Sequence, residues 1–227
     1  MAMTIRTLIL AVALAATPLW GEFAVAQSTD PFTPEEREVA YAEAIARRSS
    51  AILELLTLND AAKSNRLHGI LMAQYRALRA RDEAMDQMFA VLARDVPHAA
   101  TNRAAILPII SKPLHEQFFA RLAAELTPEQ VELVKDKMTY HKVEVTYKAY
   151  CDILPRLDSS DKTMIMTALK EAREEAIDGG SADEKSAIFQ KYKDRINTRL
   201  NAKGFDVAKA TREWEARQKQ AAPQATP

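Results

Sequence analysis

The segment "ELTPEQ", residues 125–130, guides the interpretation of the whole chain because it carries every signal for the start of an α-helix. Thr127 can accept a hydrogen bond from a free backbone N–H, and Pro128 suits the first helical position. Gln130 can reach back to the N–H of Thr127, and Glu129 lies at the positive end of the helix dipole. The segment therefore predicts a helix start and gives its acid a structural reason to be there.

The same start signal recurs along the chain. The strict form returns as "TPEE" at residues 33–36, and looser forms pair Thr57 with Asp60, Asp158 with Asp161, and Ser181 with Glu184. Apolar residues recur at helical spacing after these starts. The pattern predicts helices over residues 33–55, 58–94, 113–125, 127–153, 158–178 and 182–203, with a loop and a short helical piece over 95–112. We therefore expect an all-α fold, a single-domain bundle of six or seven helices.

The first 26 residues have the order of a secretory signal. Arg6 precedes an apolar run from residue 8 to residue 20, and "AVAQ" follows, with cleavage expected between Ala26 and Gln27. The apolar run is shorter than the roughly 20 residues of a membrane span, and no later segment is apolar enough to be one. We expect a signal peptide at 1–26, a linker at 27–32, a helical domain at 33–220 and a disordered tail at 221–227, in a periplasmic or secreted protein.

Composition argues against a nucleic-acid partner. The chain of 227 residues has 31 basic and 31 acidic side chains. Loss of the signal removes one of each, Arg6 and Glu22, so the net charge stays zero, whereas nucleic-acid-binding proteins present a basic face. Cys151 is the one cysteine. Its apolar neighbours favour burial, and pairing of two chains stays open.

Three longer segments carry a resemblance to a known family. These are "LELLTLNDAAKSNRL" at 53–67, "LHEQFFARLAAELTPEQVELVKDKMTY" at 114–140, and "YKDRINTRLNAKGFDVAKATREW" at 192–214. With them, residues 52–214 resemble a bacterial family of exported proteins named domain of unknown function 3826. The resemblance implies no particular activity, and associates the chain loosely with bacteria that degrade polysaccharides. A weaker resemblance, carried by residues 126–130, is to periplasmic L-T-x-x-Q helical stress chaperones and metal-responsive proteins.

The residues that could form a site lie in two short segments. His115 and Glu116 stand together in "LHEQFF", and Tyr140, His141 and Glu144 stand in "TYHKVE". Histidine and carboxylate side chains can bind ligands or move protons, and a tyrosine face can stack on a sugar ring. The histidines lack the paired spacing of a helical zinc site, so no metal or other cofactor is expected. A structural role for all five residues stays open, and no catalytic residue can be named.

The chain lacks the glycine-rich phosphate loop, the dinucleotide fingerprint and the nucleophile elbow of common enzyme classes. We therefore expect an exported helical protein that acts through binding or scaffolding, with carbohydrate or another exported protein as partner. One alternative is an enzyme or accessory factor in polysaccharide degradation, whose carboxylates converge only in the fold. A second is a periplasmic chaperone or metal-responsive protein.

Overall fold

The computed structural model describes residues 32–95 and 103–221. The predicted signal peptide at 1–26 lies outside these residues. So do all but the last residue of the predicted linker at 27–32, and all but the first residue of the predicted tail at 221–227.

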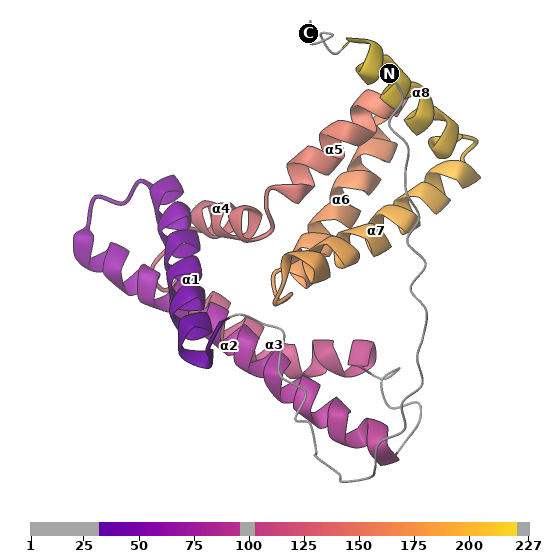
Figure 1. Cartoon of the computed structure of the whole chain (residues 1–227). Coiled ribbons are helices and arrows are strands. Elements are labelled where there is room, and N and C mark those ends of the chain that lie inside the picture. The colour runs from indigo at the N-terminus through magenta and orange to yellow at the C-terminus, as the bar shows by residue number, and fades with distance from the viewer. Residues whose placement is uncertain (1–31, 96–102, 222–227) are drawn as a thin grey trace, which may run out of the picture. The chain divides into compact units, whose positions relative to one another are not determined.

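The described residues are helical between turns and contain no strand. Figure 1 shows their eight helices: α1 (Pro34–Leu56), α2 (Ala61–Asp95), α3 (Arg103–Ala123), α4 (Pro128–Met138), α5 (Lys142–Ile153), α6 (Ser159–Ala176), α7 (Ala182–Ala202) and α8 (Val207–Ala221). The all-α prediction is therefore confirmed, with more helices than the six or seven expected. None of the helices in the described ranges is both long enough and apolar enough to cross a membrane.

The chain divides into two compact units, Met1–Val39 and Ala40–Pro227. In the first unit, Thr33 begins α1 with the predicted reciprocal cap. The N–H of Glu36 donates to Oγ1 of Thr33 at 3.2 Å, and the N–H of Thr33 donates to Oε2 of Glu36 at 2.7 Å. This exchange satisfies two of the backbone donors that a helix start leaves free.

In the second unit, the start signal at residue 127 forms as the sequence predicts. The N–H of Gln130 donates to Oγ1 of Thr127 at 3.3 Å, and the N–H of Thr127 donates to Oε1 of Gln130 at 3.1 Å. Asp158 and Asp161 form the same reciprocal cap at the start of α6. These two caps are local chemistry, which is why the sequence alone was sufficient to predict them.

The predicted cap at residue 57 is wrong. Thr57 follows α1 in a left-handed conformation, with φ of 45°. Asp60 is itself the cap of α2, because its Oδ1 accepts from the N–H of Lys63 at 3.0 Å and its carbonyl accepts from Ser64 at 2.9 Å. Asp206 starts α8 by the same chemistry. A lone aspartate can therefore cap without the preceding threonine that the prediction required.

The predicted continuous helix over 127–153 is also wrong, because two left-handed residues separate α4 from α5. Tyr140 has φ of 58° and His141 has φ of 53°. The N–H of His141 turns back to the carbonyl of Asp136 at 2.8 Å, and that of Tyr140 to the carbonyl of Lys137 at 3.1 Å. Glycine or asparagine normally takes such a position, so neither side chain signalled a helix end.

Helix α3 begins about ten residues earlier than predicted and includes Pro108 and Pro113. The prediction of a loop with a short helical piece is therefore wrong for residues 103–112 in its loop part, because these residues are continuously helical with the rest of α3. Residues 96–102 lie outside the described ranges. Pro113 has no N–H to offer the carbonyl of Ile109. Ile109 is 73% exposed, so water can donate a hydrogen bond to that carbonyl in place of the missing N–H. The helix therefore continues past the proline.

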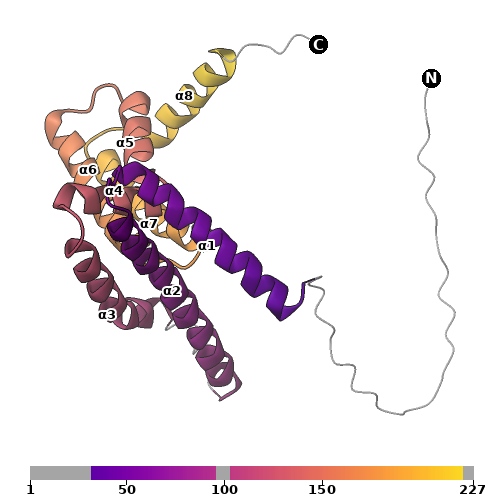
Figure 2. The ribbon, with the colours of Figure 1, turned by 90° about the vertical axis from the view of Figure 1, so that its left-hand side faces the viewer.

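Two apolar clusters stabilise the second unit. One joins α1, α2, α3 and α4 around buried side chains such as Ile52, Leu71 and Leu122, and the other joins α5, α6, α7 and α8 around Ile165, Leu169, Ile196 and others. Figures 1 and 2 show α6 and α7 side by side, connected by a short turn. The buried guanidinium of Arg173 on α6 pairs with Glu132 and Asp136 of α4, and so links the two clusters.

The aromatic side chains of the second half divide between core and surface. Tyr150, Phe189 and Tyr192 are buried in the second cluster, which supports a packing role for them. Tyr140 is 46% exposed and remains available to a ligand. Cys151 is a free thiol of intermediate burial, rather than the buried residue expected.

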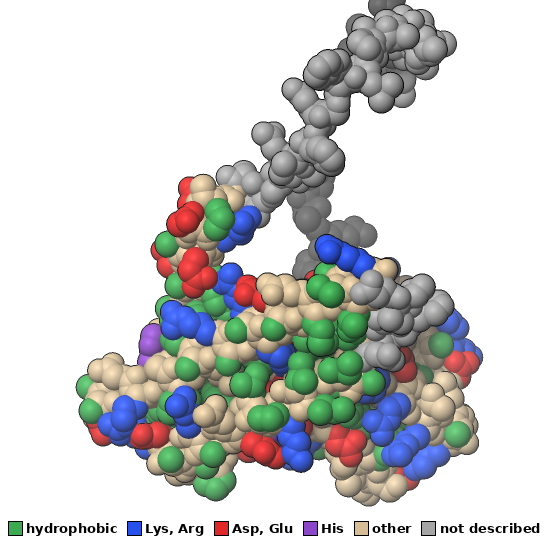
Figure 3. All heavy atoms as spheres, turned by 90° about the horizontal axis from the view of Figure 1, so that it is seen from below, with side chains coloured by type: hydrophobic (Ala, Val, Ile, Leu, Met, Phe, Trp, Pro, Cys, Tyr) green, Lys and Arg blue, Asp and Glu red, His purple; other side chains and the backbone are tan. Residues whose placement is uncertain are grey.

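Large apolar side chains are also exposed where α2 ends and α3 begins. Figure 3 shows the face that includes these helices, with hydrophobic side chains gathered beside basic and acidic ones. The exposed apolar residues here are Met88, Val91, Leu92, Ile109 and Ile110. Residues 96–102, which connect the two helices, lie outside the described ranges.

Candidate functional site

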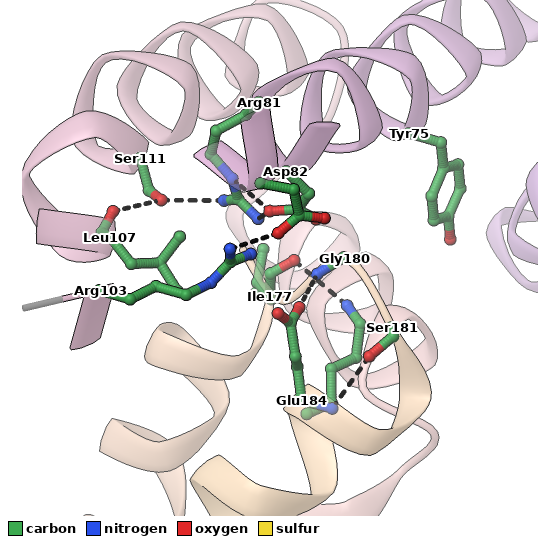
Figure 4. A network of polar contacts seen from close by, with 12 residues as sticks. Tyr75, Arg81, Asp82, Arg103, Leu107, Ser111, Ile177, Gly180, Ser181 and Glu184 are labelled. Carbon is green, nitrogen blue, oxygen red and sulfur yellow. Dashed lines mark hydrogen bonds and ion pairs between the residues drawn. The ribbon is translucent and has the colours of Figure 1, made fainter. Parts of the chain in front are cut away.

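The turn between α6 and α7 is the backbone around which the candidate site is built. The N–H of Gly179 donates to the carbonyl of Ala176 at 3.0 Å, and Ser181 caps α7 by accepting from the N–H of Glu184 at 3.0 Å. The carboxylate of Glu184 accepts from the N–H of Gly180 at 2.7 Å. The reciprocal cap that the sequence predicted would instead use the N–H of the next residue, Ser181. Figure 4 shows Glu184 bent back over the turn.

Helix α2 packs directly against this turn. A Cβ on Gly180 would lie 1.8 Å from Oδ2 of Asp82, which no real side chain could tolerate. Burial raises the pKa of Asp82, and its hydrogen bonds to Arg81 oppose that rise. A side chain at residue 180 would force the Asp82 carboxylate to move, so this close approach, and not a left-handed conformation, favours glycine here.

Arg81 holds that carboxylate and also fixes α3. Its guanidinium donates to Oδ1 of Asp82 at 2.7 Å and to Oγ of Ser111 at 2.8 Å, and the hydroxyl of Ser111 donates to the carbonyl of Leu107 at 2.7 Å. Arg81 is only 7% exposed. Figure 4 shows these residues from α2 and α3 converging beside the turn. The turn is thus supported by a buried, charged network.

Lys185, in the first turns of α7, is the most unusual charged residue nearby. The residue is 4% exposed, and its Nζ donates to the carbonyl of Ile177 at 3.2 Å. No carboxylate in the described ranges forms an ion pair with it. Burial lowers the pKa of Lys185 to about 8, and the positive charges of Arg48 and Arg81 add to that effect.

Lys185 lines a cavity of about 330 Å³, which we term the cationic pocket. Its basic side chains come from four places in the chain: Arg48 on α1, Lys137 on α4, His141 between α4 and α5, and Lys185 on α7. Tyr75 and Tyr140 add two phenols, and no carboxylate lines the cavity. The remaining lining residues are apolar or small: Ala51, Ile52, Met138, Gly179, Gly180, Ser181 and Ala182.

The strained backbone between α4 and α5 contributes to this pocket. Both left-handed residues, Tyr140 and His141, line it. A left-handed conformation costs a residue with a side chain about 1–3 kcal/mol, and such strain is concentrated at functional sites. The pocket therefore obtains two of its polar side chains from a backbone arrangement that helix formation alone does not favour.

Tyr75 forms part of the wall from α2. Burial raises its pKa to about 12, while the positive charge of Arg48 opposes the rise. The guanidinium of Arg48 lies 6.0 Å from the centre of the Tyr75 ring, near the limit of a cation–π contact. Arg48, Lys137 and His141 form no ion pair with any residue in the described part of the chain. Their hydrogen-bond donors are therefore available to an anion.

A second cavity lies on the other side of Gly179, and we term it the His115 pocket. It has a volume of about 520 Å³. Its charged side chains include the four carboxylates of Glu174, Glu175, Asp178 and Glu184, together with Lys112, His115 and Lys191. Carboxylates thus predominate here, in contrast to the cationic pocket.

His115 pairs with Asp178 inside this second cavity. Nδ1 of His115 lies 3.0 Å from Oδ2 of Asp178, and this hydrogen bond raises the pKa of the imidazole. The ring also lies against Phe119, with centroids 4.6 Å apart. Oδ1 of Asp178 is buried and has no hydrogen-bond partner among the described residues. The arrangement resembles a histidine oriented by a carboxylate, but among the residues that the structure describes no nucleophile is hydrogen-bonded to that histidine.

The five residues selected from the sequence are distributed unequally. Tyr140 and His141 line the cationic pocket, and His115 lines the other cavity. Glu116 is exposed, at 3.8 Å from Nζ of Lys112, and Glu144 is exposed on α5. Within the described ranges, the side chains of His141 and Glu144 do not hydrogen-bond to each other. In the same part of the chain, no group of three or more potential ligands could hold a metal ion.

Sequence reasoning missed Arg48, Tyr75, Asp178 and Lys185. One signal was present for Lys185, because it occupies the buried stripe of α7 that continues through Phe189, Tyr192, Ile196 and Leu200. A lysine at a position that helical periodicity assigns to the core is a reason to look for a special environment. No comparable signal distinguishes Arg48 from the other arginines of α1.

Comparison with known proteins gives the chain a family but no activity. No curated protein matches the chain. The model of the family described as "Protein of unknown function (DUF3826)" matches residues 42–220, which is most of the chain and contains every residue of both pockets. The resemblance inferred from residues 52–214 is therefore confirmed, and the chain belongs to the family described as "Protein of unknown function (DUF3826)".

Proposed function

We propose that the protein is an exported binding protein that holds a small anionic ligand, such as an acidic sugar, in the cationic pocket. The observation that carries this proposal is the composition of the cavity wall: Arg48, Lys137, His141 and Lys185 line it, and no carboxylate does. Charge-assisted hydrogen bonds from such donors to a carboxylate or phosphate are about twice as strong as neutral ones. The volume of about 330 Å³ lies at the lower end of the range for small-ligand sites.

The phenols favour a sugar acid over a bare inorganic anion. Tyr140 is 46% exposed at the pocket, so its ring can cover the apolar face of a pyranose. Tyr75 is deeper and stays protonated over the physiological range, since its pKa is raised to about 12. Its hydroxyl can therefore donate a hydrogen bond to a ligand oxygen.

Export is the part of this proposal that rests on sequence. The apolar run and small-residue site within residues 1–26 support it, and they lie outside the described ranges. Expression of the full chain in a Gram-negative host, followed by fractionation and N-terminal sequencing, tests it. A periplasmic or secreted product that begins at Gln27 supports export. A cytoplasmic product that retains Met1 contradicts it.

Titration calorimetry on the purified protein tests the binding site itself. We expect glucuronate, gluconate or inorganic phosphate to bind, and glucose to bind more weakly than glucuronate by at least about tenfold, because only the acid uses charged hydrogen bonds. Lys137→Ala should weaken binding of the acid by about tenfold or more. Lys170→Ala removes one exposed positive charge from α6, outside the pocket, and should leave the affinity unchanged.

Two results would count against the proposed site. The first is equal affinity for glucose and glucuronate, which would mean that the ligand's negative charge does not contribute to binding. The second is an equal effect of Lys137→Ala and Lys170→Ala, which would mean that net charge, and not the pocket, attracts the anion. A folded protein that binds none of the anions would overturn the proposal.

A further inference from the structure

The amine of Lys185 is buried without a carboxylate partner in the described part of the chain, and anion binding does not explain this arrangement. The residue lines the cationic pocket although it is 4% exposed. Among the described residues its Nζ makes one hydrogen bond, to the carbonyl of Ile177 at 3.2 Å, while an ammonium group has three donors to satisfy. A buried ammonium group normally has a carboxylate partner, because charge is costly to bury unpaired.

The charged groups around Lys185 do not supply that partner. Asp178 on the α6–α7 turn and Glu184 on α7 favour the charged amine, and Arg48 on α1 and Arg81 on α2 oppose it. Neither carboxylate forms an ion pair with Lys185 within the described ranges: Oδ2 of Asp178 pairs with His115 while its Oδ1 has no hydrogen-bond partner there, and Glu184 accepts from the N–H of Gly180.

These surroundings favour the neutral amine. Removal of water, with no ion pair to replace it, lowers the pKa of Lys185 to about 8. The neutral form, which carries the nucleophilic lone pair, is therefore far more abundant near neutral pH than for an exposed lysine. Desolvation and a neighbouring positive charge are the two features that activate lysines for reaction with carbonyl compounds.

We propose that Lys185 forms an imine with a ligand that carries both a carboxylate and an aldehyde or ketone carbon. This inference rests on the proposed function, since the anion-binding residues of the pocket, Arg48 and Lys137, would hold the carboxylate. A 2-oxo acid and the open-chain form of a sugar acid share this chemistry.

The reaction balances without an oxidant or reductant. The lone pair of Nζ attacks the carbonyl carbon and forms a C–N bond, while the carbonyl oxygen gains a proton and becomes a hydroxyl. The carbinolamine then loses the C–O bond and a nitrogen-bound hydrogen, and water leaves as the C=N bond forms. His141 lines the same cavity and can move protons to and from that oxygen, and the Tyr75 hydroxyl can donate a hydrogen bond to it.

Reductive trapping on the full-length protein tests the inference. The protein is incubated with pyruvate and sodium cyanoborohydride at pH 8, digested, and mapped by mass spectrometry. The expected adduct adds one pyruvic acid less one oxygen atom to the peptide that contains Lys185, because condensation removes one water and reduction returns two hydrogen atoms. We expect labelling of Lys185 to exceed that of the exposed Lys170 by about tenfold or more, because its amine is activated.

Acetone provides the matched reagent, because it offers a ketone without the carboxylate. Since acetone is intrinsically less reactive, labelling at Lys185 is compared with labelling at Lys170 for each reagent. The ratio should be clearly lower with acetone than with pyruvate, because acetone meets the same activated amine but lacks the carboxylate that the pocket holds. Lys185→Met, which keeps an unbranched side chain, should remove the adduct. Peptide mapping of the unaltered protein gives the same information if that variant fails to fold.

The outcomes separate this inference from the proposed function. Pyruvate adducts distributed over exposed lysines, with none enriched at Lys185, would overturn the imine even if glucuronate still binds. Enrichment at Lys185 that is equal for pyruvate and acetone would overturn the acid-bearing ligand class. A purely structural Lys185, engaged only with Ile177, would give no enrichment with either reagent.

Discussion

The unpaired amine of Lys185 should make the stability of the protein depend on alkaline pH in a way that one substitution removes. The fall of the Lys185 pKa from 10.5 to about 8 corresponds to about 3 kcal/mol of folding free energy, at roughly 1.4 kcal/mol for each tenfold change in proton affinity. Because the residue is only 4% exposed, solvent screening does not remove this amount, which we take as an upper value. Lys185→Met abolishes the titration and keeps the apolar contacts of the side chain.

The sign follows from the proton count. The folded state holds its Lys185 proton less tightly than the unfolded state, so the unfolded state binds more protons between about pH 8 and pH 10.5, and the free energy of unfolding rises with pH in that window. The penalty is complete below about pH 8 and is relieved above it. Relative to the variant, the unaltered protein should gain about 3 kcal/mol between pH 7 and pH 10.5.

Urea unfolding of both proteins at pH 7, 8, 9 and 10 measures this difference. Lys185→Met also loses the hydrogen bond to Ile177, which changes its free energy of unfolding by the same amount at every pH. The test is therefore how the difference in free energy of unfolding between the two proteins changes with pH. Lys170→Met, an exposed control, should give a difference that is flat with pH. A flat difference for Lys185→Met as well would mean that its pKa is ordinary, and would refute both the unpaired amine and its activation.

Three further predictions concern the caps and turns around the pockets. Thr127→Ala should lower the free energy of unfolding by about 0.5–2 kcal/mol, measured by urea unfolding, and leave glucuronate binding intact, because the residue only caps a helix. Gly180→Ala should destabilise by about 1–3 kcal/mol, since its Cβ would meet a carboxylate oxygen at 1.8 Å, whereas Gly69→Ala, in open space within a helix, should stabilise by about 0.5–1 kcal/mol. Asp178→Asn should lower the pKa of His115, followed by NMR titration, because the carboxylate that raises it is gone; an unchanged pKa would contradict the pairing.

The parts of the fold that the sequence predicted are those fixed by neighbouring residues. A helix start needs only four consecutive residues, so the reciprocal caps at Thr127 and Asp158 could be predicted correctly. The end of α4 could not, because Tyr140 and His141 take conformations that their own side chains disfavour. The N–H groups of both residues turn back to carbonyls of the last turn of α4, and a periodic apolar pattern does not indicate such a turn. Pro108 and Pro113 predict a break in the helix, yet both lie inside α3. An exposed helix face tolerates the hydrogen bond that a proline removes.

The candidate site was harder to predict because its residues come from separate helices. Arg48, Tyr75 and Lys137 are each ordinary in their local sequence, whereas Lys185 is distinguished by its place in the buried stripe of α7. The cationic pocket forms where α1, α2, the α4–α5 break and the α6–α7 turn meet. Residue type alone predicts a ligand-binding role for Tyr140, His141 and His115. Tyr140 and His141 line the cationic pocket, and His115 lines the His115 pocket.

Two unfavourable features of this chain coincide at one cavity. The left-handed pair Tyr140 and His141 stores about 1–3 kcal/mol of backbone strain per residue, and Lys185 carries a desolvation penalty of about 3 kcal/mol below pH 8. Glycine at residues 140 and 141 would relieve the backbone strain, and methionine at residue 185 would relieve the desolvation penalty. Packing therefore does not require either penalty. Their causes are independent, one in backbone geometry and one in charge. An anion bound in the cationic pocket offsets the second directly, since it supplies the negative charge that Lys185 lacks.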